Sequence, residues 1–266
     1  MRSTLLLSLL ALAAAPPAAA QGIVLPMRCA GACPERALAI DSVRVWTSVS
    51  EQGRAATSVN HVIRNASADS VEGAFFFPIP EDAVVEQVMV HVRQDIQLIG
   101  EWTRPDEARL LLDGLARERP HAGLAAYRGR RMMHVRIPAI APGAAKQLVI
   151  SYSQMLPTGG QPIAWRYPLS LGAAASPIGH LSLRMEVKTR SGFTDLRSLS
   201  HRIDVEWGTE MGRCPPNARC GYMGVPSRRV KRVRLEPSEA TRRRDFELVY
   251  VLAPPGTVRP VLDEQP

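Results

Sequence analysis

Apolar and polar residues alternate along most of this chain, in short runs that glycine and proline interrupt. The alternation begins with Leu38, Ile40, Val43 and Val45, and it returns in segments such as 71–77. Successive side chains of a strand point to opposite faces, so this pattern places one face against a core. The 22 prolines and 19 glycines, which separate short apolar runs, are typical of a mainly β chain. We therefore predict a mainly β fold.

The periodic segments predict strands at regular intervals. These cover residues 37–49, 55–63, 71–77, 84–92, 95–102, 131–140, 147–155, 163–169, 180–188, 201–207, 227–235 and 244–252. A turn at Gly53 predicts that the first two strands form a hairpin. Phe75 and Phe77 share one face of the third strand and Phe76 points the other way, so we expect both faces to be covered. Pro78 ends this strand, because proline cannot donate to a sheet ladder.

One segment has the period of a helix instead. Within residues 104–119, Ala108, Leu111, Leu112 and Leu115 follow at spacings of three and four, which makes one apolar stripe. A threonine, a proline and two acidic residues open the segment, as at many helix N-termini. We predict one amphipathic helix that lies across one end or face of the sheets.

The N-terminus has the three parts of a secretory signal peptide. A positive start at Arg2 precedes an apolar run over residues 5–15 and an Ala-x-Ala site that ends at Ala20. The run is shorter than the roughly 20 apolar residues that span a bilayer, and no second run is longer. We predict cleavage after Ala20, no membrane span, and a secreted or periplasmic protein.

Composition then divides the remaining chain. We predict an N-terminal loop with a cysteine pair over residues 21–36 and the first β domain over residues 37–156. A proline and glycine cluster at 157–162 predicts a boundary. We predict a second, smaller sandwich-like module over residues 163–252 and a flexible tail over residues 253–266.

Four cysteines, Cys29, Cys33, Cys214 and Cys220, predict disulfides, because an exported chain with an even count is typically cross-linked. Three pairings are possible. The local one joins Cys29 to Cys33 and Cys214 to Cys220, and it needs only tight loops. The alternative is a zinc site of four thiolates, although five residues separate the second pair where two to four are usual.

Asn65-Ala66-Ser67 fits two patterns. It matches an N-glycosylation acceptor, and it also lies where the chain needs a turn, which asparagine favours. We favour the turn.

Motifs spread over residues 37–156 resemble a known family. They are Asn65, the run Glu72 to Pro80 with its three phenylalanines, Ala83-Val84-Val85, Ala108 and the helix after it, Leu124 with Tyr127 and Gly129, the run Pro138 to Gly143, and Tyr152. Together they resemble the VIT domain, the vault protein inter-alpha-trypsin module. The resemblance implies a β-sandwich with one helix, acting as a secreted, non-catalytic module in protein–protein or cell-surface and matrix interactions.

The same resemblance bears on metals. In this family a von Willebrand factor type A domain usually follows and holds a divalent metal through an Asp-x-Ser-x-Ser loop, a sequence not found in this chain. The six scattered histidines form no His-x-x-x-His pair, and no Gly-x-Ser-x-Gly or phosphate-cradling glycine loop is present. We therefore expect no cofactor, no metal and no enzymatic activity. An uncharacterised hydrolase is the less favoured alternative, because catalytic triads form in space rather than in sequence.

The chain has a formal net charge of +8, and basic residues gather near its end. They are Arg228, Arg229, Lys231, Arg232, Arg234, Arg242, Arg243 and Arg244. If the two strands they flank were paired, the patch would suit a polyanion such as an acidic glycan or lipopolysaccharide. The favoured alternative is a strand whose charges guard a sheet edge. Nucleic acid is not expected, because the chain is exported and no stacking aromatics interleave the charges. We expect another envelope or extracellular protein as the partner.

Overall fold

The chain folds mainly into β-strands. The computed structural model describes residues 22–29, 31, 33–93, 96–118, 131–158, 162–169, 178–212, 225–235 and 245–254. The elements are β1 (Ile23–Cys29), β2 (Leu38–Val49), β3 (Arg54–Asn65), β4 (Val71–Pro78), β5 (Val84–Arg93), β6 (Ile96–Ile99), β7 (Trp102–Thr103), α1 (Pro105–Glu118), β8 (Met132–Ile140), β9 (Ala145–Met155), β10 (Ile163–Tyr167), β11 (His180–Thr189), β12 (Phe193–Ser198), β13 (Asp204–Gly212), β14 (Val225–Leu235) and β15 (Phe246–Leu252). The predicted mainly β class with one helix is confirmed over these residues.

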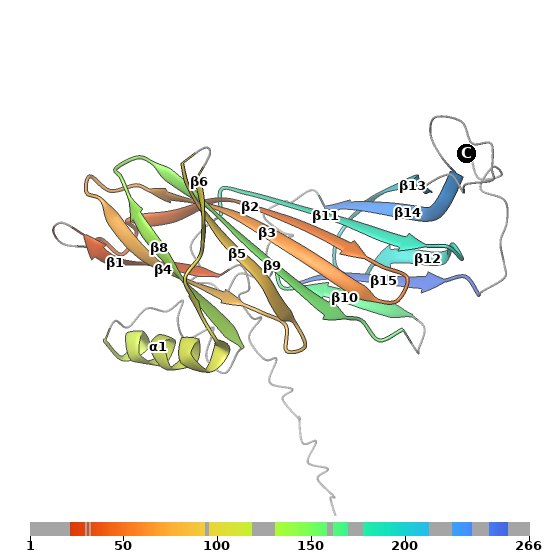
Figure 1. The fold of residues 1–266 in the computed structure, drawn as a ribbon, viewed down its shortest axis with the longest axis horizontal. Helices are drawn as coiled ribbons and strands as arrows, with labels where there is room; N and C mark the ends of the chain where they lie inside the picture. Colours follow the sequence, from red (N-terminus) through yellow and green to blue (C-terminus); the bar gives the residue numbers. More distant parts are fainter. Residues whose placement is uncertain are drawn as a thin grey trace, which may run out of the picture.

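The strands form three sheets. The long sheet has eight strands in the order β13-β14-β11-β2-β3-β9-β5-β6, and the shorter sheets have the orders β1-β4-β8-β7 and β10-β15-β12. Figure 1 shows the four-stranded sheet and α1 towards one end of the molecule and the three-stranded sheet towards the other. One hydrophobic core contains buried side chains from all three sheets. The architecture is therefore a sandwich in which one long sheet packs against two short ones.

The predicted boundary at 157–162 falls between β9 and β10. Beyond it, β11 pairs in parallel with β2, from His180 opposite Ser42 to Val187 opposite Val49. Through this pairing, β11, β14 and β13 extend the sheet that β2 begins. The segments on either side of the boundary therefore share one sheet and one core.

The three phenylalanines of β4 face two layers. Phe75 and Phe77 are fully buried in the main core, and their rings lie against His61 of β3. Phe76 is fully buried in a second cluster that includes Ala108 of α1. The expectation that both faces of this strand are covered is confirmed.

The helix α1 covers the outer face of the four-stranded sheet. Ala108, Leu112 and Leu115 are buried as the apolar stripe predicts. Leu111, the fourth member of the predicted stripe, is 37% exposed. The buried stripe is therefore narrower than the sequence predicts.

Residues 23–29 form strand β1, so the loop predicted over 21–36 is wrong there. Ile23, Val24 and Leu25 are buried, and the strand pairs with β4. The register shifts between Pro26 and Arg28, which accommodates a proline in an edge strand. A run this short, interrupted by proline, carries too little periodicity to be recognised from sequence.

A disulfide joins Cys29 to Cys33, with their Cα atoms 5.3 Å apart. This confirms the local pairing predicted for the first two cysteines. Cys214 and Cys220 lie outside the described residues.

Two other strands differ from prediction. The segment predicted as one strand over 95–102 divides into β6 and β7, which belong to different sheets. It divides because the Gly100 amide donates to Val88 of β5, while the Glu101 carbonyl accepts from Arg136 of β8. The sequence also missed β12, and the strand predicted over 201–207 begins at Asp204.

Asn65 ends β3 as a fully buried side chain. Its Nδ2 donates to the carbonyls of Asp69 at 2.6 Å and Ile140 at 2.8 Å, and its Oδ1 accepts from the amide and hydroxyl of Ser67. Both amide hydrogens are therefore used within the fold. The structure favours the turn over the glycosylation acceptor, which would need this nitrogen exposed.

Glu51 joins the β2–β3 turn to the β11–β12 turn. Its Oε1 accepts hydrogen bonds from the Thr189 hydroxyl, the Arg190 amide and both the amide and hydroxyl of Ser191. Partial burial raises the pKa of Glu51, but these hydrogen bonds lower it by more, so the pKa lies below its ordinary value of 4.5. The folded state therefore favours the ionised carboxylate.

Replacing Glu51 by glutamine should lower the free energy of unfolding by about 1 kcal/mol at pH 7, because a neutral amide is the weaker acceptor. The folded-state pKa lies below the unfolded one. The Glu51 carboxylate therefore stabilises the fold fully at a pH above its unfolded-state pKa. This stabilisation is lost as the pH falls through the folded-state pKa. Urea unfolding from pH 7 to pH 3 should show the difference shrinking towards zero. Glu81→Gln, at an exposed position, is the control, and an E51Q penalty that stays constant with pH would contradict the assignment.

Candidate interaction surfaces

The predicted basic strand lies inside the long sheet. β14 pairs with β11 on one side and β13 on the other, so the alternative of an edge strand guarded by charge is wrong. β15 belongs to the three-stranded sheet, and it does not pair with β14. Arg242, Arg243 and Arg244 lie outside the described residues. Over the described residues, β14 and β15 are thus not brought together as paired strands.

Most of the described basic residues of β14 have acidic partners on the neighbouring strands. The ion pairs are Arg228–Glu210 at 3.5 Å, Arg232–Glu186 at 3.1 Å and Arg234–Glu206 at 2.9 Å. A hydrogen bond from Lys188 is the main reason that the pKa of Glu210 is lowered, which favours its ionised form. Sequence reasoning missed these acids because they come from β11 and β13. The compensation leaves β14 much less basic towards solvent than its sequence predicts.

Lys231 faces the other side of the sheet. It is 9% exposed, and its ammonium lies 4.0 Å from the ring centroid of Trp207 and 5.0 Å from that of Phe193. Such cation–π contacts stabilise a charge that is partly removed from water. Arg229 also lies near β12, with its guanidinium against Gly192. Neither Lys231 nor Arg229 lies on the same face of β14 as Arg228, Arg232 and Arg234.

The edge strand β13 carries exposed apolar side chains on one face. Val205, Trp207 and Met211 alternate along it and are 36%, 54% and 44% exposed. Trp207 contacts Phe193 edge to face, with ring centroids 6.4 Å apart. Within the part of the chain that the structure describes, β13 pairs with β14 alone. A strand edge and an apolar face are therefore available at the same place.

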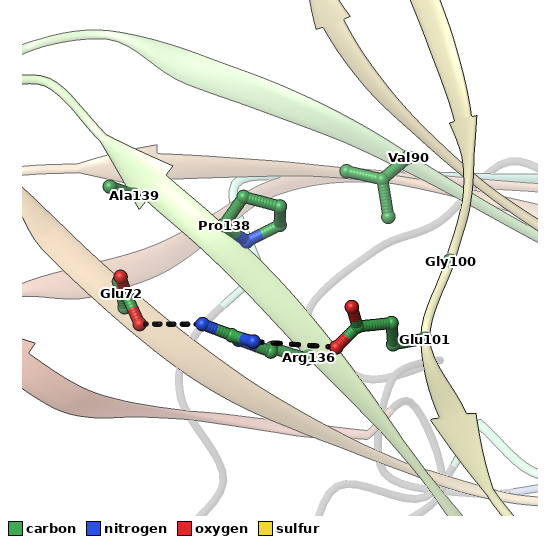
Figure 2. Close-up of a pocket in the computed structure, with 7 residues that line it drawn as sticks. All are labelled: Glu72, Val90, Gly100, Glu101, Arg136, Pro138 and Ala139. Atoms are coloured by element: carbon green, nitrogen blue, oxygen red, sulfur yellow. Dashed lines mark hydrogen bonds and ion pairs between the residues drawn. The ribbon is translucent and has the colours of Figure 1, made fainter.

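A pocket of about 260 Å³ lies beside the connection from β6 to β7. Figure 2 shows Arg136 between Glu72 and Glu101, with ion pairs of 3.4 Å to each. Hydrogen bonds that Arg136 donates to Glu72 and then to Glu101 raise the pKa of Arg136. An arginine that stays charged serves neither as an acid nor as a base, and the pocket is smaller than most ligand sites. The three side chains therefore link β4, the connection and β8.

Neither a metal-binding cluster nor a membrane-spanning helix is found among the described residues. No group of three or more His, Cys, Asp or Glu side chains is placed to hold a metal ion there. Among the same residues, no helix is long and apolar enough to cross a membrane.

The sequence of the first β domain matches a family model. The family is described as the vault protein inter-alpha-trypsin domain, VIT, and the match covers residues 40–152. These residues run from β2 to β9 and include α1. No curated protein matches the chain.

Several solved structures are more distantly similar to this chain. A proposed nutrient-binding protein from Legionella pneumophila is 14% identical with a TM-score of 0.47, covering 88% of this chain and 72% of its own. An M1 zinc metallopeptidase from Deinococcus radiodurans is 9% identical with a TM-score of 0.40, covering 81% and 42%. A proposed protease from Parabacteroides distasonis is 10% identical with a TM-score of 0.41, covering 82% and 41%. This chain spans less than half of the latter two chains, and none of these likenesses carries an inference about activity.

Proposed function

Because residues 40–152 form a VIT domain, we propose that this chain is a non-catalytic interaction module that works outside the cytoplasm and docks on another protein. The observation that carries this proposal is the edge of β13. A nine-residue strand with three exposed apolar side chains on one face is the kind of edge that proteins normally protect. An extended segment of a partner can add to such an edge as a further strand.

The charge pattern of the long sheet indicates what kind of segment fits. On the outer face, basic β14 lies between Glu186 of β11 and the acids Glu206 and Glu210 of β13. Opposite charges on neighbouring strands stabilise a sheet. By the same rule, a strand added beside β13 places basic residues next to its acids and apolar residues next to Val205, Trp207 and Met211. The partner segment is therefore extended, with alternating basic and apolar side chains.

A synthetic peptide of about nine residues that alternates valine and lysine should bind in the micromolar range, which corresponds to about 8 kcal/mol. A peptide of the same composition with its lysines in one block should not, because alternation sets which face each side chain takes. Met211→Lys should weaken binding at least about tenfold. Isothermal titration calorimetry measures all three.

Leu110→Lys is the matched control, since Leu110 is 66% exposed on α1, far in the chain from β13. Equal affinity for the alternating and block peptides would overturn strand addition. An unchanged affinity in Met211→Lys would overturn the placement at β13.

Export is part of the proposal. It is supported by the signal-peptide pattern over residues 1–20 and by the disulfide between Cys29 and Cys33, since disulfides persist in oxidising compartments. Expressed from its full sequence in a host that secretes it, the protein should begin at Gln21, and N-terminal sequencing checks this. Recovery of the uncleaved chain in the cytoplasm would contradict it.

A further inference from the structure

The outer face of the long sheet, on the side away from the core, carries one exposed tryptophan. Trp46 of β2 is 47% exposed. In the register of the sheet it lies opposite Arg184 of β11 and Ser58 of β3. Neighbouring positions on the same face hold short polar side chains. They are Ser42, Ser48, Asn60 and Ser182. The indole is therefore surrounded by groups that leave it accessible and offer hydroxyl and amide hydrogen bonds.

Two arginines beside Trp46 have no acidic partner among the residues that the structure describes. Arg44 lies two residues before it on β2, and both Arg44 and Arg184 are exposed. Over the described ranges the side chain of neither arginine makes a salt bridge or a hydrogen bond. By contrast, Arg232 and Arg234, on the next strand of the same face, are both paired. Within the described part of this face, Arg44 and Arg184 therefore place uncompensated positive charge beside Trp46.

We propose that this face binds an acidic saccharide, with a sugar ring stacked on Trp46 and its carboxylates held by Arg44 and Arg184. The negative face of an aromatic ring attracts the polarised C–H bonds of a sugar. Arginine binds carboxylates through paired hydrogen bonds. The proposal uses a different face from the β13 edge, so either can fail without the other.

The size of the apolar surface favours a saccharide over a protein. A stable protein interface buries about 800 Å² per partner around an apolar core. Here a single indole supplies the apolar contact among serine, asparagine and arginine side chains. The middle of a sheet also has no free backbone edge for an extended peptide. One pyranose ring matches the indole in area.

Trigalacturonic acid and galactotriose are matched probes, because the first carries a carboxylate on each ring where the second carries a hydroxymethyl group. The native protein should bind trigalacturonic acid at least about tenfold more tightly at low salt, with the advantage falling as ionic strength rises. Binding should change the tryptophan fluorescence. Calorimetry gives the affinities.

The variants separate the two contacts. Trp46→Ala should lose at least about tenfold in affinity for both sugars and abolish the fluorescence change. Arg44→Gln and Arg184→Gln should each lose about three- to tenfold for the acidic sugar and little for the neutral one. Trp102→Ala and Arg202→Gln, at exposed positions elsewhere, are the matched controls and should bind normally.

Two results would overturn the proposal. Equal affinity for the acidic and neutral sugars, unaffected by the arginine variants, would show that Arg44 and Arg184 do not bind carboxylates. A triglutamate peptide that binds as tightly as trigalacturonic acid, with no loss in Trp46→Ala, would reassign the face to acidic peptides. Circular dichroism of each variant, matching the native spectrum, excludes misfolding as the cause of a loss.

Discussion

Replacing Asn65 by aspartate should lower the free energy of unfolding by about 3 kcal/mol at pH 7. The Asn65 Nδ2 donates to the carbonyls of Asp69 and Ile140 in a fully buried position. The substitution keeps the shape but sets an acceptor oxygen against those two carbonyls, and it removes the amide hydrogen that each of them accepts. Unsatisfied buried polar groups cost about 1–3 kcal/mol each, and buried charges cost more.

The penalty should depend on pH. Burial against two carbonyl oxygens disfavours the ionised form of the introduced carboxyl group, which raises its folded-state pKa above the unfolded one. The penalty is therefore smallest below the unfolded pKa of about 4 and grows as pH rises. Urea unfolding between pH 3 and pH 7 measures it.

Ser67→Ala is the matched control for Asn65. It removes only the Ser67 hydroxyl, which donates to Oδ1 of Asn65 and to the Asp69 carbonyl. That change should cost about 1 kcal/mol with no dependence on pH. If Asn65→Asp cost no more than this control, the Asn65 side chain would not hold the end of β3 to the end of β8.

Replacing Trp165 by alanine should lower the free energy of unfolding by about 4 kcal/mol. Trp165 is fully buried in β10 of the three-stranded sheet, and its ring lies against those of Tyr167 and Phe246. It belongs to the same core as Val45 of β2. We therefore expect one cooperative transition, shifted as a whole, in thermal and urea unfolding.

Hydrogen exchange tests the same point locally. In Trp165→Ala, amide protection should fall in β3 and β9 as well as in β10 and β15, because the long sheet and the three-stranded sheet share one core. Trp46→Ala is the control, the same substitution at an exposed position, and it should cost less than about 0.5 kcal/mol. Two transitions, with only one shifted by Trp165→Ala, would show that the regions on either side of residue 157 unfold independently.

The candidate surfaces were only partly predictable. Alternation along β14 puts Val233 and Leu235 on one face and Arg232 and Arg234 on the other, and their burial agrees with this pattern. The sequence did not predict that Glu186 and Glu206, from two other strands, would pair with those arginines. Cross-strand partners depend on which strands are neighbours, and periodicity within one strand does not contain that information.

The amino-acid sequence by itself determined the local features of this protein. Alternation of apolar and polar residues predicted most of the strands. The three consecutive phenylalanines of β4 predicted that this strand is covered on both faces. The helical spacing of Ala108, Leu112 and Leu115 predicted the helix. These are properties of consecutive residues, so they can be read without the fold. Only the tertiary structure decided that β11 pairs in parallel with β2, that β14 is interior and β13 is the edge, and that Arg44 and Arg184 stand unpaired beside Trp46. Each of those depends on contacts between segments far apart in the chain, where many pairings have similar local preferences and packing of the whole core selects one.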